Sequence, residues 1–137
     1  MREIHNILFD LDGVLYRGEE AVPAAPPTLA ELRARSVRLV FLTNNSARTP
    51  EQVADKLRAM GIAADPNEVV TSALATAELL ARRGGGRVFV IGQDGVREAL
   101  AGAGLGILEG EPETADLVVV GKSSKAAIRA ADRSSAN

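Results

Sequence analysis

The feature that most constrains the fold is an apolar run that ends in two acids and a glycine, residues 7–13, Ile-Leu-Phe-Asp-Leu-Asp-Gly. A continuous apolar run is typical of a buried strand in a parallel sheet. Open α/β sheets bind ligands just beyond the carboxyl ends of their strands, which is where Asp10 and Asp12 fall. Two carboxylates so close together repel each other unless something positive joins them. The run therefore predicts an α/β fold with a metal ion, a shared proton or both beside its first strand.

Composition narrows the classes of function. The 137 residues suffice for one domain or parts of two, and 46% hydrophobic residues supply a core. A net charge of −2 gives no case for a nucleic-acid or membrane partner. The absence of cysteine excludes disulfides, thiolate catalysis and Cys-based zinc sites, and the single His5 excludes a multi-histidine metal site. No apolar leader or membrane-length span is found, so we expect a cytoplasmic protein.

The first half of the chain reads as strand, helix, strand. A strand is expected at 4–9, followed by a polar, acidic loop to Val22, a helix at 27–35 and a second strand at 37–42. This order implies a right-handed parallel crossover. If the two strands are neighbours, Asp10, Asp12 and Thr43 lie at the same edge of the sheet.

The second half alternates in the same way. Helices are expected from Thr49, a candidate cap, to about Met60, and at 73–83 and 95–102, with strands at 68–71, 87–91 and 116–120. The glycine run 84–86 is the best candidate for a boundary. We therefore divide the chain into 1–83, with a Rossmann-like parallel sheet; 84–121, a partial α/β segment; and 122–137, a Ser-, Lys- and Ala-rich tail.

The loops after the first two strands favour phosphoryl transfer. They bring together a carboxylate nucleophile, a second carboxylate and a hydroxyl, and a metal ion would offset the charge between an anionic nucleophile and a phosphate. Gly13 lets the backbone turn sharply and approach a ligand. Thr43 can donate its hydroxyl to a phosphate oxygen, helped by the backbone N–H groups of Asn44 and Leu11.

These residues resemble a known family. Residues 10–18, Asp-Leu-Asp-Gly-Val-Leu-Tyr-Arg-Gly, look like motif I of the haloacid dehalogenase superfamily. Residues 41–50, Phe-Leu-Thr-Asn-Asn-Ser-Ala-Arg-Thr-Pro, look like motif II of its class IIA branch. That branch includes nitrophenylphosphatases, phosphoglycolate phosphatases and nucleotide monophosphatases. The resemblance spans residues 4 to about 121 and implies that 84–121 is part of an α/β cap domain.

The resemblance also implies roles for the site residues. Asp10 would attack phosphorus and form an aspartyl-phosphate, while Asp12 would protonate the leaving oxygen and then activate water. Mg²⁺ would be held by the Asp10 carboxylate and the Asp12 backbone carbonyl. Thr43 would bind the phosphoryl group, and Asn44 would orient that loop or the substrate. The expected partner is a small phosphorylated metabolite.

The chain departs from the family pattern in its last third. The family carries a motif III lysine and a motif IV Gly-Asp that completes the Mg²⁺ shell, and its members are longer, so we interpret this chain as truncated. No convincing motif IV is found. Lys122, within a short resemblance to motif III, is either that lysine or part of an atypical tail, which we favour. We therefore expect weak or no activity, and an exposed half-sheet that favours self-association.

Two other functions stay open. The chain can be a non-enzymatic remnant that binds an anion or a partner chain, as the missing motif IV suggests. It can also be a phospho-receiver domain, although receivers pair adjacent acids, whereas Leu11 separates Asp10 from Asp12 here. Among the site residues, Asn44, Asn45 and Ser46 can equally be simple turn formers. Asp94 follows a strand as a ligand would, but turn chemistry explains it better.

Overall fold

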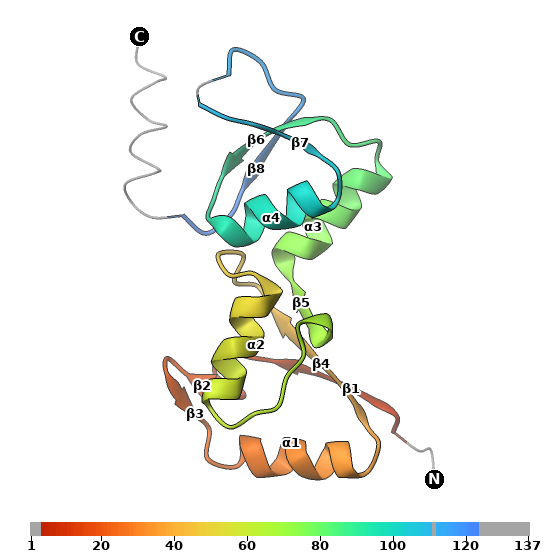
Figure 1. Ribbon diagram of the computed structural model, residues 1–137, viewed down its shortest axis with the longest axis vertical. Helices are drawn as coiled ribbons and strands as arrows, with labels where there is room; N and C mark the ends of the chain where they lie inside the picture. Colours follow the sequence, from red (N-terminus) through yellow and green to blue (C-terminus); the bar gives the residue numbers. More distant parts are fainter. Residues whose placement is uncertain (1–3, 111, 124–137) are drawn as a thin grey trace. The chain divides into compact units, whose positions relative to one another are not determined.

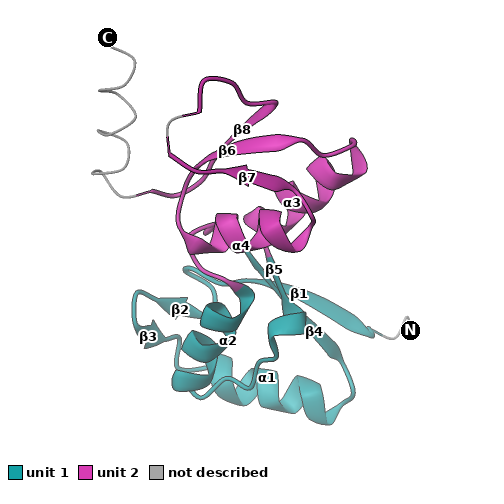
Figure 2. Cartoon of the chain, turned by 45° about the horizontal axis from the view of Figure 1, so that its top comes forward, with its two compact units in different colours: residues 1–43, 50–70 teal, residues 44–49, 71–137 magenta. Residues whose placement is uncertain are grey.

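The computed structural model describes residues 4–110 and 112–123 and divides the chain into two compact units (Figure 2). The first unit comprises Met1–Thr43 and Pro50–Val70. The second comprises Asn44–Thr49 and Thr71–Asn137. The chain therefore passes from one unit to the other after residues 43, 49 and 70.

The first unit is built on a three-stranded sheet. Its strands are β1 (Asn6–Asp10), β4 (Arg38–Thr43) and β5 (Val69–Thr71), in the order β1-β4-β5 (Figure 1). β1 and β4 are parallel, with Asn6 opposite Arg38 and Asp10 opposite Leu42. The expected strand–helix–strand unit with neighbouring strands is therefore confirmed.

Two helices supply the core of the first unit. α1 (Ala25–Ala34) begins with prolines in its first turn, where a missing N–H removes no helical hydrogen bond. α2 (Pro50–Ala59) buries one face, and a 3-10 helix η1 (Pro66–Glu68) precedes β5. The core joins both helices to alternate residues of β4: Leu29, Leu39, Phe41, Val53 and Leu57. Burial of these side chains is the main force that holds the unit together.

The loop expected after β1 contains a small hairpin that the sequence analysis missed. β2 (Tyr16–Arg17) and β3 (Glu20–Ala21) pair antiparallel around Gly18, whose φ of +59° is easy for glycine alone. Tyr16 is buried, and the ammonium group of Lys56 lies 4.3 Å from the centre of its ring. The hairpin was missed because each strand has only two residues, too few to show an alternating pattern, and the surrounding loop is polar.

The second unit is a three-stranded parallel sheet with two helices (Figure 1). β6 (Arg87–Ile91) lies between β7 (Gly106–Leu108) and β8 (Leu117–Val120). α3 (Ser72–Arg82) and α4 (Asp94–Gly102) share a hydrophobic core with this sheet through Ala77, Val88, Val90, Val96 and Leu100. β7 was not expected, because three residues that include a glycine carry too little periodic signal.

The glycine run 84–86 lies within the second compact unit, and the domain boundary that we expect there stays a prediction. The division falls between Val70 and Thr71 because Ala73 and Ala77 of α3 are buried in the core of the second unit. The other predicted elements match within about two residues, the usual spread of element ends. The tail helix near 124–132 lies outside the described residues.

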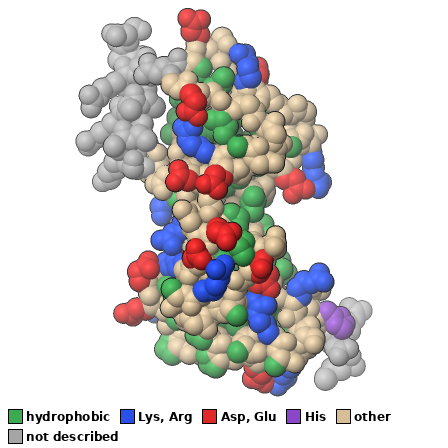
Figure 3. Space-filling model, viewed as in Figure 1, with side chains coloured by type: hydrophobic (Ala, Val, Ile, Leu, Met, Phe, Trp, Pro, Cys, Tyr) green, Lys and Arg blue, Asp and Glu red, His purple; other side chains and the backbone are tan. Residues whose placement is uncertain are grey.

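Each sheet leaves apolar side chains exposed on the face opposite its core. Leu8 on β1 is 60% exposed, and Val118 and Val120 on β8 are 61% and 69% exposed. These residues alternate with the core residues of their strands, so they belong to the second face of each sheet. The expected uncovered apolar face is confirmed, while self-association stays a prediction. Charged side chains of both signs are interspersed on the visible face of each unit (Figure 3).

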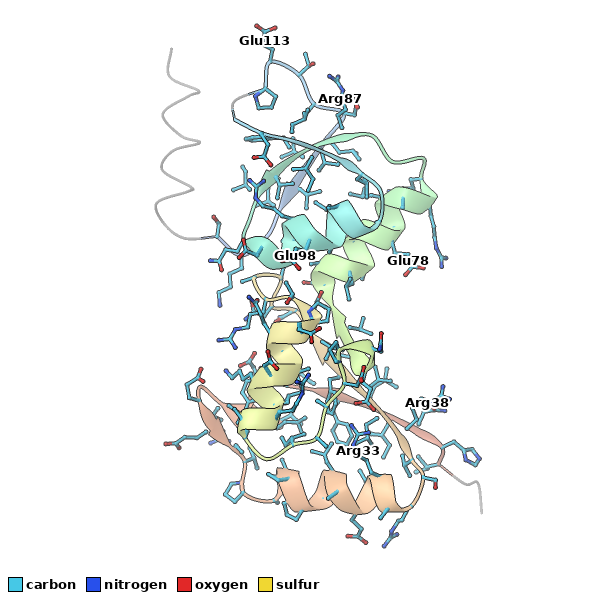
Figure 4. All side chains as sticks on the ribbon, in the orientation of Figure 1. Arg33, Arg38, Glu78, Arg87, Glu98 and Glu113 are labelled. Atoms are coloured by element: carbon cyan, nitrogen blue, oxygen red, sulfur yellow. The ribbon has the colours of Figure 1, made fainter. Side chains whose placement is uncertain are left out.

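An ion pair fixes the segment that leads into β5. Arg33, which extends from α1 toward the strands (Figure 4), donates through both terminal nitrogens to the two carboxylate oxygens of Glu68, at 2.8 and 2.7 Å. Arg33 also donates to the carbonyl of Ala63 at 2.8 Å, and the Asp65 N–H donates to Glu68 at 3.0 Å. The pKa of Glu68 is lowered, chiefly by the hydrogen bond from Arg33. Such two-pronged pairs are stronger than single contacts.

We predict that Glu68→Gln lowers the free energy of unfolding by about 1 kcal/mol at pH 7, because the charge-assisted contacts to Arg33 are lost. A lowered pKa means that the folded state favours the carboxylate, so the contribution is complete above the ordinary pKa of about 4.3 and declines as the pH falls through the lowered value. Urea titrations of both proteins between pH 7 and pH 3 measure this. An unchanged difference across that range would contradict the assignment.

Candidate active site

The carboxyl ends of β1 and β4 bring together three residues predicted to act in the site. Asp10 is the last residue of β1 and Thr43 the last of β4, and Asp10 lies opposite Leu42. Asp12 follows two residues later and forms an isolated bridge with Tyr16. Thr43 is buried, whereas both aspartates are exposed. An acid pair and a hydroxyl thus occupy one edge of the first unit's sheet, where such folds bind ligands.

A tight turn presents the second aspartate. Leu11 is fully buried, and its carbonyl accepts hydrogen bonds from the N–H groups of Val14 and Leu15 at 3.2 and 2.9 Å. Gly13 has a φ of +84°, and its N–H donates to the Tyr16 carbonyl at 2.8 Å. A Cβ at Gly13 would meet nothing within 4 Å, so the turn needs glycine for its backbone angle and not for space.

Neither aspartate has a charge-balancing partner among the residues that the structure describes. Within residues 4–110 and 112–123, we find no hydrogen bond or ion pair to either the Asp10 or the Asp12 carboxylate. In the same part of the chain, no group of three or more His, Asp or Glu residues is placed to hold a metal. The pair and the Asp12 carbonyl are suitable oxygen ligands for Mg²⁺, but only part of the six that it takes.

The loop that follows Thr43 is anchored in the second unit. Hydrogen bonds hold residues 44–49 there. The Ser72 hydroxyl donates to the Asn44 carbonyl at 3.0 Å, and the Gly95 N–H donates to the Ala47 carbonyl at 3.1 Å. The backbone N–H of Lys122 donates to the Ser46 hydroxyl at 2.8 Å. Within the loop, Asn45 Oδ1 accepts from the Ala47 N–H at 3.1 Å, so Asn45 acts as a turn former.

Two glycines allow this loop to pack closely. A Cβ on Gly95 would lie 2.5 Å from the Arg48 carbonyl oxygen and 2.6 Å from that of Ser46. A Cβ on Gly121 would lie 2.5 Å from Val96 Cγ2 and 2.8 Å from Ser46 Oγ. Sequence reasoning missed Ser46, Gly95 and Gly121 as supports of the loop. The available signal was Gly95 itself, because glycine is unfavourable within a helix and its lack of a side chain permits a close backbone approach.

The second unit contains a cavity of about 320 Å³. Its polar wall comes from the loop, the first turns of α3 and the second residue beyond the end of β8: Asn44, Ser46, Ser72, Thr76 and Lys122. Its apolar wall includes Val96, Leu100 and Val119. Two of the residues predicted to bind phosphate or substrate, Asn44 and Lys122, therefore line this cavity.

The chain is similar in sequence to one family of hydrolases and to several curated phosphatases. The haloacid dehalogenase-like hydrolase family matches residues 7–106. An acid sugar phosphatase of Staphylococcus saprophyticus is 43% identical over 122 residues, which cover 88% of this chain and 46% of that protein. The Staphylococcus aureus protein of the same name is 42% identical over the same share. The chain thus spans about half the length of the curated relatives it matches.

Several solved structures have the same fold over most of this chain. NagD from Escherichia coli superposes with a TM-score of 0.81 at 30% identity, covering 99% of this chain and 54% of that one. A double mutant of a thermostable NPPase from Geobacillus stearothermophilus gives 0.79 at 38%, with coverage of 91% and 48%. A glycerol phosphate phosphatase from Mycobacterium tuberculosis, solved with calcium, gives a TM-score of 0.77 at 32% identity, covering 88% of this chain and 35% of that one.

No helix in the described part of the chain has the length and apolar character to cross a membrane.

We predict that Gly95→Ala destabilises the loop 44–49. The new methyl group would collide with backbone carbonyls, which cannot rotate away, at a cost of about 1–3 kcal/mol in unfolding free energy. Amide hydrogen exchange of residues 44–49, together with urea titration, measures the effect. Gly102→Ala is the matched control in the same helix, because its Cβ would meet nothing within 4 Å and alanine favours a helix. Equal exchange in the two variants would refute the packing argument.

Proposed function

The chain belongs to the haloacid dehalogenase-like hydrolase family, and we propose that its first unit carries the nucleophilic half of a Mg²⁺-dependent phosphate monoesterase. One observation supports this more than any other. The exposed carboxylates of Asp10 and Asp12 have no partner among the described residues and lie at the sheet edge that Thr43 also reaches. Two uncompensated carboxylates beside a hydroxyl are arranged to bind a cation and, through it, a phosphate.

The proposed reaction has two steps. An Asp10 carboxylate oxygen attacks phosphorus, the bond to the ester oxygen breaks, and the Asp12 carboxyl gives its proton to that departing oxygen. Asp12, now ionised, takes a proton from water as the water attacks the phosphorus of the aspartyl-phosphate. Inorganic phosphate leaves and Asp10 is restored. Mg²⁺, held by the Asp10 carboxylate and the Asp12 carbonyl, would offset the negative charge of nucleophile and phosphate.

Thr43 and Asn44 complete the proposed phosphoryl contacts. Thr43 ends a buried strand, so its position is fixed by the core of the first unit. Asn44 begins the anchored loop, and its carbonyl is bonded to Ser72. Hydroxyl and backbone N–H donors held in this way stabilise charge on a phosphoryl group without reorganising during the reaction.

The small number of protein ligands for Mg²⁺ favours slow turnover. The Asp10 carboxylate and the Asp12 carbonyl leave much of the Mg²⁺ shell to water and substrate, because the described residues contain no group of three or more acidic or histidine ligands placed to hold a metal. We therefore propose weak activity on small phosphate esters for this chain. The names of its relatives, which include acid sugar phosphatases and a glycerol phosphate phosphatase, suggest small hydroxylated substrates. If turnover is absent, the small number of Mg²⁺ ligands favours the second candidate, a remnant that binds a phosphate-like anion.

We predict that acid quenching of the protein with Mg²⁺ and ³²P-labelled phosphate ester traps a hydroxylamine-sensitive label on Asp10. Asp10→Asn abolishes the label because an amide is a far weaker nucleophile. Asp94→Asn, a matched change at another acid that follows a strand, leaves the label unchanged because Asp94 only begins α4. Label that persists in Asp10→Asn, or that maps to another residue, would disprove the assignment.

Binding of Mg²⁺ can be tested apart from turnover. We predict that millimolar Mg²⁺ with orthovanadate raises the thermal midpoint by a few degrees, because a ligand that binds only the folded state stabilises it. Asp10→Asn should remove most of this rise, since it deletes a metal oxygen and a negative charge. A rise of equal size in wild type and Asp10→Asn would place the bound ion elsewhere.

A further inference from the structure

Lys56 on α2 is a lysine whose side chain is largely buried against the hairpin that follows Asp12. The side chain is only 13% exposed, and its ammonium group lies 4.3 Å from the centre of the Tyr16 ring. We propose that Lys56 is a positioning residue, which holds Tyr16 and through it the backbone on both sides of Asp12. The inference rests on the proposed function in so far as Asp12 acts on the leaving group.

The backbone of Tyr16 is bonded to both neighbours of Asp12. The Tyr16 N–H donates to the Leu11 carbonyl at 3.4 Å, and the Tyr16 carbonyl accepts the Gly13 N–H at 2.8 Å. These bonds close the turn 11–16, in which Asp12 also forms its isolated bridge with Tyr16. A displacement of Tyr16 would therefore move the Asp12 carbonyl and the base of the Asp12 side chain together.

The hairpin needs side-chain contacts to stay in place. β2 and β3 have two residues each and pair only with each other among the described strands. A two-stranded hairpin of this kind is at best marginally stable by its backbone hydrogen bonds. The buried ring of Tyr16 joins the hairpin to the core of the first unit, and the Lys56 ammonium lies over that ring. The pair is thus the contact that ties the hairpin to α2.

The helix gives Lys56 a fixed origin. Val53 and Leu57 of α2 are buried in the core that also contains Tyr16. A cation over the face of an aromatic ring is attracted to it, and more strongly where water is excluded, as it largely is here. The ammonium group also pairs with Glu19 Oε1 at 3.1 Å, but Glu19 is 80% exposed, so this ion pair adds little.

Amide hydrogen exchange of the full chain tests the positioning without any turnover. Lys56→Met keeps an apolar stem of similar length but removes the charge. The Gly13 amide should then exchange about fivefold to thirtyfold faster relative to the amides of β4, as expected when one desolvated contact between a cation and a ring is lost. Lys56→Arg should restore most of the protection, because a guanidinium also lies well over aromatic rings. An unchanged Gly13 rate in Lys56→Met would overturn the inference.

Two variants are matched controls. Glu19→Gln removes the exposed ion pair but keeps the cation over the ring, so exchange in the turn 11–16 should stay within about twofold of wild type. Arg58→Met makes a similar change on the same helix, where it removes bonds to the Asp55 carboxylate and the Ala64 carbonyl and none to the hairpin. Faster exchange in the turn after Arg58→Met would show that α2 as a whole protects it, which would also overturn the inference.

Single-turnover labelling then connects the turn to the chemistry. At saturating Mg²⁺, the rate of ³²P transfer to the protein is compared for two esters. The alkoxide of glycerol phosphate needs a proton from Asp12 as it leaves, whereas the leaving group of 4-nitrophenyl phosphate is stable without one. Lys56→Met should lower the ratio of the first rate to the second at least about tenfold, while a loss of folded protein would lower both rates alike. An unchanged ratio would make Lys56 a structural residue only.

The inference and the hydrolase proposal fail in different ways. Wild type that takes no label, with faster exchange in Lys56→Met, would reject the hydrolase and leave Lys56 as the residue that holds the turn. Wild type that takes label, with exchange and rate ratio unchanged in Lys56→Met, would reject the inference alone. If Lys56→Met does not fold, Lys56→Gln, which also lacks the charge, replaces it in both measurements.

Discussion

Parallel pairing of β1 with β4 is the constraint on which the candidate site depends. Asp10 lies opposite Leu42 in this ladder, so the last residues of both strands reach the same edge. A shift of one residue would turn Leu39 and Phe41 out of the core, because side chains alternate between the two faces of a strand. Burial of these two side chains therefore sets the position of Asp10 relative to Thr43, and core packing determines the geometry of the chemistry.

Much of this part of the molecule could be predicted from sequence. The apolar run before Asp10 and the second run before Thr43 are strong strand signals, and the intervening helix carries prolines where a first turn tolerates them. Such local signals need no knowledge of distant residues. The parallel neighbour relation then follows from the strand–helix–strand order, which explains why the acid pair and the hydroxyl were found together.

The rest depends on contacts between distant residues or on very short elements. Ser46 and Lys122 are 76 positions apart, and nothing in either local sequence indicates that one accepts a hydrogen bond from the other. The close approach of Gly95 to the Ser46 carbonyl is equally non-local. β7 has three residues, too few for a period to be measured. The compact units divide before α3 because two of its alanine side chains are buried in the core of the second unit, a contact that the local sequence does not indicate.

The anchoring of residues 44–49 has a consequence for synthesis. This loop leaves the ribosome early, but the N–H groups that hold it belong to Gly95 and Lys122, which are made much later. At rates of about 5–20 residues per second, the loop waits several seconds for its partners. Contacts of large sequence separation also carry the greatest loop-closure cost and form slowly. The hydrogen bonds that hold the segment beginning with Asn44 can therefore all form only after Lys122 has been made, although the segment directly follows β4.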